Sequence, residues 1–162
     1  MRVIIRKGIK SDLGEVLDLI KELAEYEDAL EDVEINLKDL EKDGFGVQPL
    51  FQFIVAKKQH ELVGLSFYFV RYSTWKGKFL YLEDFVVKKK YRGFGIGALL
   101  FEEMINICVD EKFKGMSWQV LDWNLPAINF YKKYDAEISS TWLNGKLTEK
   151  QVHSFSSKKI VS

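Results

Sequence analysis

The stretch 79–100 constrains the fold of this chain more than any other. It reads FLYLEDFVVKKKYRGFGIGALL. Aromatic and β-branched residues in its first half suit a mostly buried strand. Three alternating glycines follow at Gly93, Gly95 and Gly97, and apolar residues then recur at helical spacing from Ile96. The stretch therefore predicts a strand, a glycine-rich turn and a helix in direct succession.

The turn between this strand and this helix has the chemistry of a pyrophosphate site. Glycine lets backbone N–H groups approach an anion closely, and a helix N-terminus adds partial positive charge. The basic residues around the turn are Lys88, Lys89, Lys90 and Arg92. A plain glycine turn is the alternative without a ligand.

Three phosphate-binding patterns compete for this turn. A P-loop requires Gly-Lys-Ser/Thr, but Gly97 is followed by Ala98, so that pattern fails. A dinucleotide fingerprint can be placed on 93–98, but it expects an acid near the end of the next strand. The third pattern, Arg/Gln-x-x-Gly-x-Gly/Ala, is met by Arg92, Gly95 and Gly97.

Two acids, Glu83 and Asp84, lie inside the predicted strand. A carboxylate in an apolar strand is costly unless it is paired, solvated or used. Successive strand residues point to opposite faces, so the two acids face different ways unless a bulge intervenes. They are candidates for proton transfer and for holding a cation.

Composition sets outer limits on fold and function. A chain of 162 residues with 47% hydrophobic residues predicts one globular domain, 1–162. The formal net charge of zero argues against nucleic acid as the main partner. Acids are concentrated in 12–43, which is either a solvated helix face or an acidic wall for a cationic substrate.

The single cysteine and the hydropathy pattern narrow the class of protein further. Cys108 excludes an internal disulfide and falls on an apolar helical stripe, which favours a small buried hydrophobe over a nucleophile. His60 and His153 show no metal-ligand spacing, so we expect no metal. With no signal peptide or membrane-spanning run, we expect a soluble cytoplasmic enzyme without a membrane partner.

The remaining periodicities predict an α/β fold with a mixed sheet, antiparallel at first and parallel in the middle. The helices are expected from Lys10 or Ser11 to about Glu27, from Asn36 to Gly44, from the glycine turn to about Lys112, and from Asn124 to about Tyr134. The strands are expected at 2–7, 51–57, 61–72, 79–87 and 115–123, with a last hairpin of 137–143 and 150–155 around Asn144-Gly145.

The Arg92-x-x-Gly-x-Gly97 pattern resembles the acetyl-coenzyme A loop of the GNAT superfamily of N-acetyltransferases. STWKG at 73–77 and VLDWN at 120–124 resemble the thialysine N-epsilon-acetyltransferase branch of the spermidine/spermine (diamine) acetyltransferase group. Further stretches are similar to that group as a whole. These stretches are IKELAEYE at 20–27, DGFG at 43–46, YLEDF at 81–85, YRGFGIG at 91–97, WN at 123–124 and NFY at 129–131.

The resemblance implies a GNAT fold, with a central mixed twisted sheet of six to seven strands flanked by about four helices. In that fold the middle parallel strands splay apart and admit the pantetheine arm of acetyl-CoA, without any metal. The cofactor residues that it implies are Phe85, Val86, Val87, Arg92, Gly93, Phe94, Gly95, Ile96, Gly97, Asn124 and Tyr131. It also implies a homodimer.

The resemblance assigns catalytic roles as well. An amine with a pKa of about 10 is protonated at neutral pH, so a base must take its proton before it attacks a thioester. Glu83 is the implied base and Asp84 the implied partner of the substrate cation. Tyr131 is the implied general acid for the leaving thiolate, with a packed helix aromatic as the alternative. A backbone N–H at a bulge around Phe85 is expected to stabilise the oxyanion, and Asn124 is a helix cap, a cofactor ligand or both.

Substrate choice depends on departures from the polyamine pattern. Polyamine enzymes carry Asp-Pro before a tryptophan where this chain has Ser73-Thr74-Trp75. Uncharged hydroxyls suit a head group with a carboxylate, which indicates thialysine, a lysine-like amino acid or a short diamine. A polyamine acetyltransferase is the alternative, and a non-catalytic acetyl-CoA-binding module is the rival from another class. The implied substrate residues are Glu27, Ser73, Thr74, Trp75, Glu83 and Asp84.

Overall fold

The computed structural model of this protein describes residues 2–156 of the 162. The chain divides into two compact units, 1–121 and 122–162. The single domain expected over 1–162 stays a prediction.

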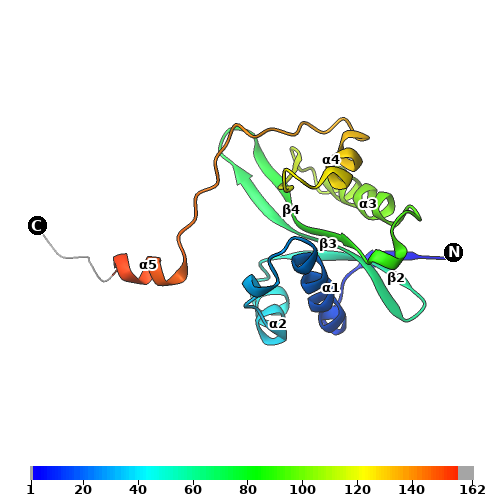
Figure 1. The fold of residues 1–162 in the computed structure, drawn as a ribbon, viewed down its shortest axis with the longest axis horizontal. Coiled ribbons are helices and arrows are strands. Elements are labelled where there is room, and N and C mark those ends of the chain that lie inside the picture. The colour runs from blue at the N-terminus through cyan, green and yellow to red at the C-terminus, as the bar shows by residue number, and fades with distance from the viewer. Residues whose placement is uncertain (1, 157–162) are drawn as a thin grey trace, which may run out of the picture. The chain divides into compact units, whose positions relative to one another are not determined.

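The first unit is built on one mixed sheet (Figure 1). Its strands run in the order β1 (Ile4–Lys7), β2 (Gln52–Lys58), β3 (Glu61–Ser73), β4 (Gly77–Val87) and β5 (Met116–Trp118). Strands β1 to β4 pair antiparallel, and β5 pairs parallel with β4. The predicted parallel crossover is confirmed, but the expectation of six to seven strands is wrong, because the described residues form five.

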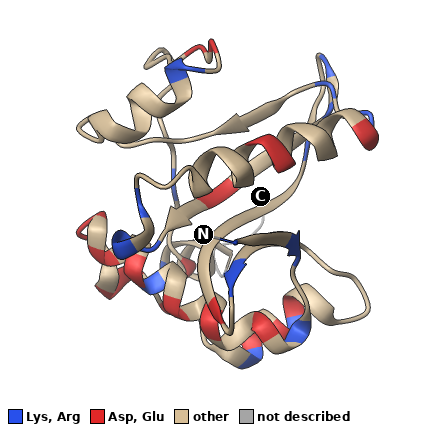
Figure 2. Cartoon of the chain, turned by 90° about the vertical axis from the view of Figure 1, so that its right-hand side faces the viewer, with Lys and Arg blue, Asp and Glu red and all other residues tan. Residues whose placement is uncertain are grey.

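Helices cover both faces of this sheet (Figure 1). Helices α1 (Leu13–Tyr26) and α2 (Leu37–Phe45) lie on one side, and α3 (Ile96–Asp110), which connects β4 to β5, lies on the other. Most acidic residues drawn on the ribbon of Figure 2 lie on helices. The mixed sheet with helices on both faces confirms the predicted α/β layout of the first unit.

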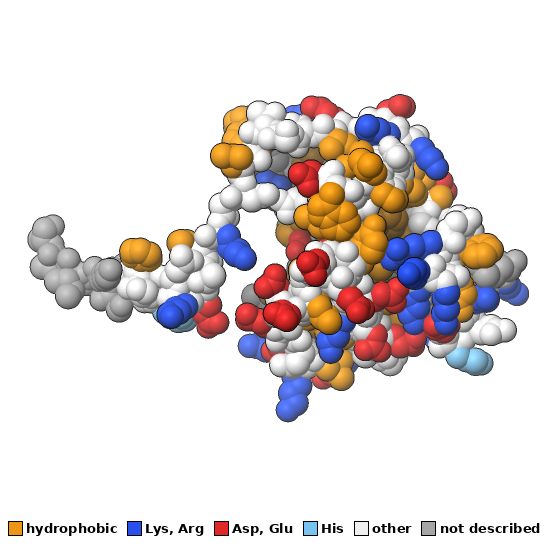
Figure 3. Space-filling model, viewed as in Figure 1, with side chains coloured by type: hydrophobic (Ala, Val, Ile, Leu, Met, Phe, Trp, Pro, Cys, Tyr) orange, Lys and Arg blue, Asp and Glu red, His pale blue; other side chains and the backbone are white. Residues whose placement is uncertain are grey.

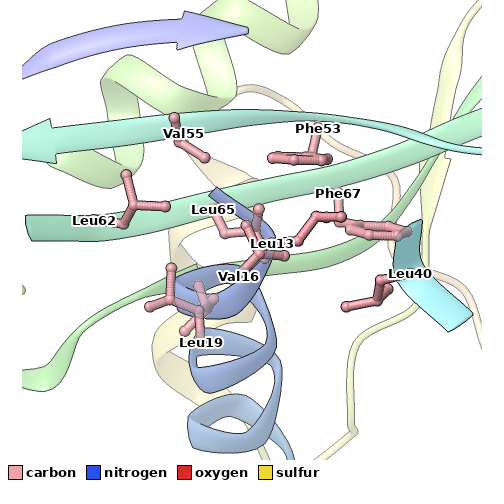
Figure 4. Close-up of a cluster of buried hydrophobic side chains, with 10 residues drawn as sticks. Leu13, Val16, Leu19, Leu40, Phe53, Val55, Leu62, Leu65 and Phe67 are labelled. Carbon is pink, nitrogen blue, oxygen red and sulfur yellow. The ribbon is translucent and has the colours of Figure 1, made fainter. Parts of the chain in front are cut away.

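A cluster of buried side chains joins α1 to the sheet (Figure 4). Leu13, Val16 and Leu19 recur along one face of the helix and are completely buried. They point toward Leu65 and Phe67 of β3 (Figure 4). Burying one such side chain contributes about 1.5–3 kcal/mol, so this packing fixes α1 against β3 and β4.

The two N-terminal helices begin in different ways. The Asn36 side chain accepts the N–H groups of Lys38 and Asp39 and caps α2, which begins directly after Asn36 as predicted. The start of α1 predicted at Lys10 or Ser11 is wrong, because a 3-10 turn, η1 (Lys10–Asp12), precedes the helix. The Asp12 carboxylate accepts the N–H of Ile9 at 2.9 Å and two bonds from Arg6, which lower the pKa of Asp12.

The second unit contains α4 (Leu125–Lys132) and α5 (Glu149–Ser156). The predicted last hairpin is wrong, because 137–143 forms no strand and the segment expected as its second strand is α5. A capping box explains this helix: Thr148 Oγ accepts the N–H of Gln151, while Gln151 Oε1 accepts the N–H of Thr148. The described chain thus has five α-helices where about four were expected.

Candidate active site

A bulge in β4 places the two acids of the sequence YLED. Tyr68 of β3 pairs with Leu82 and Phe67 pairs with Asp84, so Glu83 is an extra residue in the ladder. A bulge changes the alternation of side chains along its strand. Asp84 opposite Phe67 and Tyr81 opposite Phe69 therefore share one face of the sheet, although the two residues are three positions apart in the sequence.

Two further carboxylates act electrostatically on Asp84 beside this bulge. Glu27 ends α1 as its C-cap, and its charge acts on Asp84, as does that of Glu83. Burial, with these neighbouring charges, raises the pKa of Asp84 to about 7, and burial raises the pKa of Glu27. Within residues 2–156, none of the three acids has a Lys, Arg or His partner. The arrangement favours a bound cation, which would offset the repulsion between the acids.

The parallel pairing of β4 and β5 ends close to the bulge. It runs from Leu80↔Met116 to Leu82↔Trp118, while β4 continues to Val87. The part of β4 that contains Phe85, Val86 and Val87 therefore extends beyond β5. The opening between β4 and β5 that the pantetheine arm of acetyl-CoA would need beyond this pairing stays a prediction.

The glycine loop leaves open space over its backbone. Gly93 and Gly95 have φ values of +81° and +82°, and a Cβ built on either would meet no atom within 4 Å. Gly95 is the N-cap of α3 and has no side chain to accept the first N–H groups of the helix. Phe94 between them is exposed. These residues fit a pyrophosphate that approaches the backbone at the N-terminus of α3, where Ile96 is buried and Gly97 follows in the first turn.

The basic residues before the glycines are mostly engaged by the protein itself. Glu61 accepts bonds from Lys88 Nζ at 3.0 Å, Lys90 Nζ at 3.2 Å and the Tyr91 hydroxyl at 2.8 Å. These donors lower the pKa of Glu61 to about 2. Lys and Arg side chains gather around the loop between β4 and α3 in Figure 3. Since one carboxylate holds three side chains, Glu61 fixes the 3-10 turn η3 (Lys89–Tyr91) that leads into the loop.

Arg92, a predicted cofactor residue, also has protein partners. Its Nε donates to the Val87 carbonyl at 2.9 Å, and its guanidinium lies over the Tyr26 ring at 5.0 Å from the centroid. The Lys89 N–H donates to a Glu22 carboxylate oxygen at 3.0 Å. The loop is thus anchored to α1 as well as to β3.

We expect Glu61→Gln to loosen the loop, because it removes the charge that Lys88 and Lys90 share. Amide hydrogen exchange over 88–95 should become about fivefold faster, as for the loss of roughly 1 kcal/mol of local stability. Glu41→Gln is the control, since Glu41 forms a single exposed ion pair with Lys10 at 3.4 Å. Unchanged exchange over 88–95 in Glu61→Gln would show that Glu61 does not hold the loop.

The predicted substrate residues of the β3–β4 turn lie apart from the acids within the first unit. Ser73 pairs with Gly77 at the end of the hairpin and lies six positions beyond Phe67 in β3, about 20 Å of strand. Ser73 Oγ accepts the N–H of Lys76, while Thr74 is exposed and Trp75 is 86% exposed. A role of these three residues in substrate binding stays a prediction.

Asn124 and Tyr131 belong to the second unit. The Asn124 side chain accepts the N–H of Ala127 at 3.3 Å, which confirms its role as the cap of α4. Tyr131 is 5% exposed, and its ring lies 5.5 Å from that of Phe130. Their roles toward the cofactor and the leaving thiolate stay predictions.

Three residues on the face of Asp84 were not predicted for the site. Phe69, Arg71 and Tyr81 are brought there by the antiparallel register and the bulge. Alternation along β3 was the available signal, because Phe67, Phe69 and Arg71 recur at every second position. The pairing partner in β4 could not be read from the sequence.

Other sequence features have no visible part in this site. Burial raises the pKa of the Cys108 thiol to about 11, which is typical of an inert cysteine. Within 2–156, no set of three or more His, Cys, Asp or Glu side chains is arranged to hold a metal ion. In the same range, the helices are too short or too polar to cross a membrane.

Comparisons with known proteins agree with this geometry. The family model described as "Acetyltransferase (GNAT) family" matches residues 15–135, which include parts of both units. A thialysine N-epsilon-acetyltransferase of Bos taurus is 38% identical over 143 residues, covering 83% of this chain and 84% of the relative. A spermidine/spermine N(1)-acetyltransferase-like protein 1 of Homo sapiens is 39% identical over 134 residues, covering 78% of this chain and 19% of that protein.

The fold also matches solved structures. An integron cassette protein of Vibrio cholerae has a TM-score of 0.78 with 20% sequence identity, covering 96% of this chain and 98% of that one. At this level of identity the match concerns the fold alone.

Proposed function

The chain belongs to the GNAT family of acetyltransferases, and on that premise we propose that it transfers an acetyl group from acetyl-CoA to the primary amine of thialysine or a similar amino acid. Proteins of this family use acetyl-CoA as cosubstrate. The observation that carries the proposal is the bulge at Glu83, which sets two carboxylates beside the acid at the end of α1.

The cosubstrate would be held by the glycine loop and by β4 beyond its pairing with β5. Gly93 and Gly95 leave room for the pyrophosphate, and Phe85, Val86 and Val87 offer backbone groups to the pantetheine arm. When bound, acetyl-CoA supplies the acyl group as a thioester. The loop needs little rearrangement for this, because Glu61 already fixes η3.

The acids of β4 would prepare the amine. The substrate arrives as an ammonium, and Asp84 with Glu27 would hold that cation beside the bulge. Glu83 is exposed and can pass the proton to water, which makes it the proposed base. Direct transfer in a ternary complex requires no acyl-enzyme, and Tyr131 is the proposed acid for the thiolate.

A thiol-release assay tests the proposal directly. Purified protein with acetyl-CoA is offered thialysine, lysine, putrescine, spermidine and spermine at equal concentrations. We expect thiol release with the amino acids at a higher kcat/KM than with the polyamines. No release with any amine would refute the acetyl-transfer proposal, whereas release with spermine alone would place the activity with polyamines.

Asp84→Asn should stabilise the protein above pH 7 while lowering its activity. The raised pKa means that folding takes up a proton between about pH 4 and pH 7, so stability falls as pH rises through that window. A pKa raised to about 7 corresponds to a loss of at most about 4 kcal/mol of folding stability above pH 7. The neutral amide of the Asp84→Asn variant is not ionised, so the variant avoids this loss. Thermal melts at pH 4 and pH 8 should show a gain in Tm at pH 8 alone; equal changes at both would contradict the assigned ionisation.

A polyamine acetyltransferase is the second candidate, favoured by the acids that follow α1. Asp28, Glu31, Asp32 and Glu34 are all exposed and could attract a polycation.

A homodimer and a cytoplasmic location are also proposed by resemblance to the family, with sedimentation velocity as the test of the dimer.

A further inference from the structure

A strip of the sheet continues beyond the end of α1 on the face that carries Asp84. Along β3, the next pairs on this face are Phe69 with Tyr81 and then Arg71 with Phe79, at intervals of two residues from Phe67↔Asp84. Exposure increases along β3 in the same direction, from a buried Phe67 through a half-buried Phe69 to an exposed Arg71. The strip therefore runs from the acids out to the solvent.

The middle of the strip is aromatic. The rings of Phe69 and Tyr81 lie 5.0 Å apart between their centroids, with a tilt of 35°. Paired aromatic rings at this distance form a stable apolar surface. They offer contact to an aliphatic or thioether stem, which has no polar group to satisfy.

The far end of the strip carries a positive charge. The Arg71 guanidinium lies over the Tyr81 ring, 5.7 Å from its centroid. In the part of the chain that the structure describes, Arg71 has no ion pair with Asp or Glu. Its five N–H donors are thus available to an anion from outside, and a guanidinium matches a carboxylate with two parallel bonds.

The two charged ends act on the same phenol. Burial and the charge of Glu83 raise the pKa of Tyr81, while Arg71 opposes them. Tyr81 and Glu83 are two positions apart in β4, or about 7 Å of strand, and the Arg71 guanidinium lies back over the Tyr81 ring. The strand distance from Tyr81 to Glu83 is comparable with the length of a lysine-type side chain.

We propose that Arg71 binds the carboxylate of the acceptor substrate, so that the site takes a zwitterionic amino acid whose terminal amine lies at Glu83 and Asp84. This inference rests on the proposed acetyl transfer and names the residue that selects its substrate. The aromatic pair supports the stem between the two charged ends.

The same residue disfavours polyamines. A diamine that places one ammonium at Glu83 and Asp84 brings its second ammonium toward the guanidinium of Arg71. Like charges at that distance repel, and no acid of the strip is left to compensate. Arg71 therefore acts as a specificity determinant through attraction of one substrate and repulsion of the other.

Arg71→Gln tests this inference with two matched substrates. Lysine and cadaverine differ only by the carboxylate. We expect kcat/KM for lysine to fall by about tenfold or more, mainly through KM, because a charge-assisted contact is lost. The value for cadaverine should stay the same or rise, which also shows that the variant is folded and active.

Lys76→Gln is the control, since it removes a positive charge from the turn of the same hairpin. Its ratio of lysine to cadaverine activity should equal that of the unchanged enzyme. Equal losses for both substrates in Arg71→Gln, or an unchanged ratio of lysine to cadaverine activity, would overturn the proposed role of Arg71. Such a result would leave the proposed acetyl transfer intact. Absence of acetyl transfer to either amine in the unchanged enzyme would instead refute the proposed function.

Discussion

Replacing Gly95 with valine should weaken the binding of acetyl-CoA by about 100-fold or more, as expected when two charge-assisted contacts to backbone amides are lost. Gly95 adopts a φ of +82°, a conformation that a β-branched residue rarely tolerates. The added side chain would also occupy the open space over the loop where the pyrophosphate is expected. Isothermal titration calorimetry with acetyl-CoA measures the effect.

Gly77→Val is the matched control for backbone strain. Gly77 has a φ of +99°, and a Cβ there makes only an ordinary contact of 3.6 Å with Lys114. It lies in the β3–β4 turn and has no part in the loop. We expect a loss of stability without a loss of affinity. A folded Gly95→Val protein that binds acetyl-CoA normally would remove the assignment of the loop.

Replacing Glu83 with glutamine should lower kcat by about 100-fold at neutral pH, the usual effect of removing a general base. The amide keeps the size of the side chain and cannot take a proton. Activity should recover partly at high pH, where more of the amine is deprotonated before it binds. A pH series of kcat and kcat/KM for lysine measures both effects.

Glu25→Gln is the control for the loss of one surface carboxylate. Glu25 is exposed on α1, and its substitution should leave the pH profile unchanged. If Glu83→Gln turns over at the normal rate while Asp84→Asn does not, the base is Asp84. Normal turnover in both variants would contradict acid–base catalysis by this pair.

Local signals in the sequence determined the conformation of the glycine loop and the starts of α2 and α4. Gly93 and Gly95 do adopt positive φ, and Asn36 and Asn124 do cap their helices. These features depend on the conformational preferences of a few adjacent residues, so they can be read without the rest of the chain. The capping box from Thr148 to Gln151 is equally local, and it prevails over the turn signal Asn144-Gly145.

Only the tertiary structure decided how the acids, aromatic rings and cations are grouped. A bulge was expected around Phe85, but its position at Glu83 follows only from the pairing of β4 with β3. In the sequence, Lys88 and Lys90 are candidates for binding phosphate. In the structure both bind the carboxylate of Glu61 in β3, which lies 27 and 29 residues away in the sequence. Arg71 faces the site because of its register with β4. Pairing between distant segments depends on the packing of the whole sheet, so the sequence supplied the chemical groups and the fold determined which of them meet.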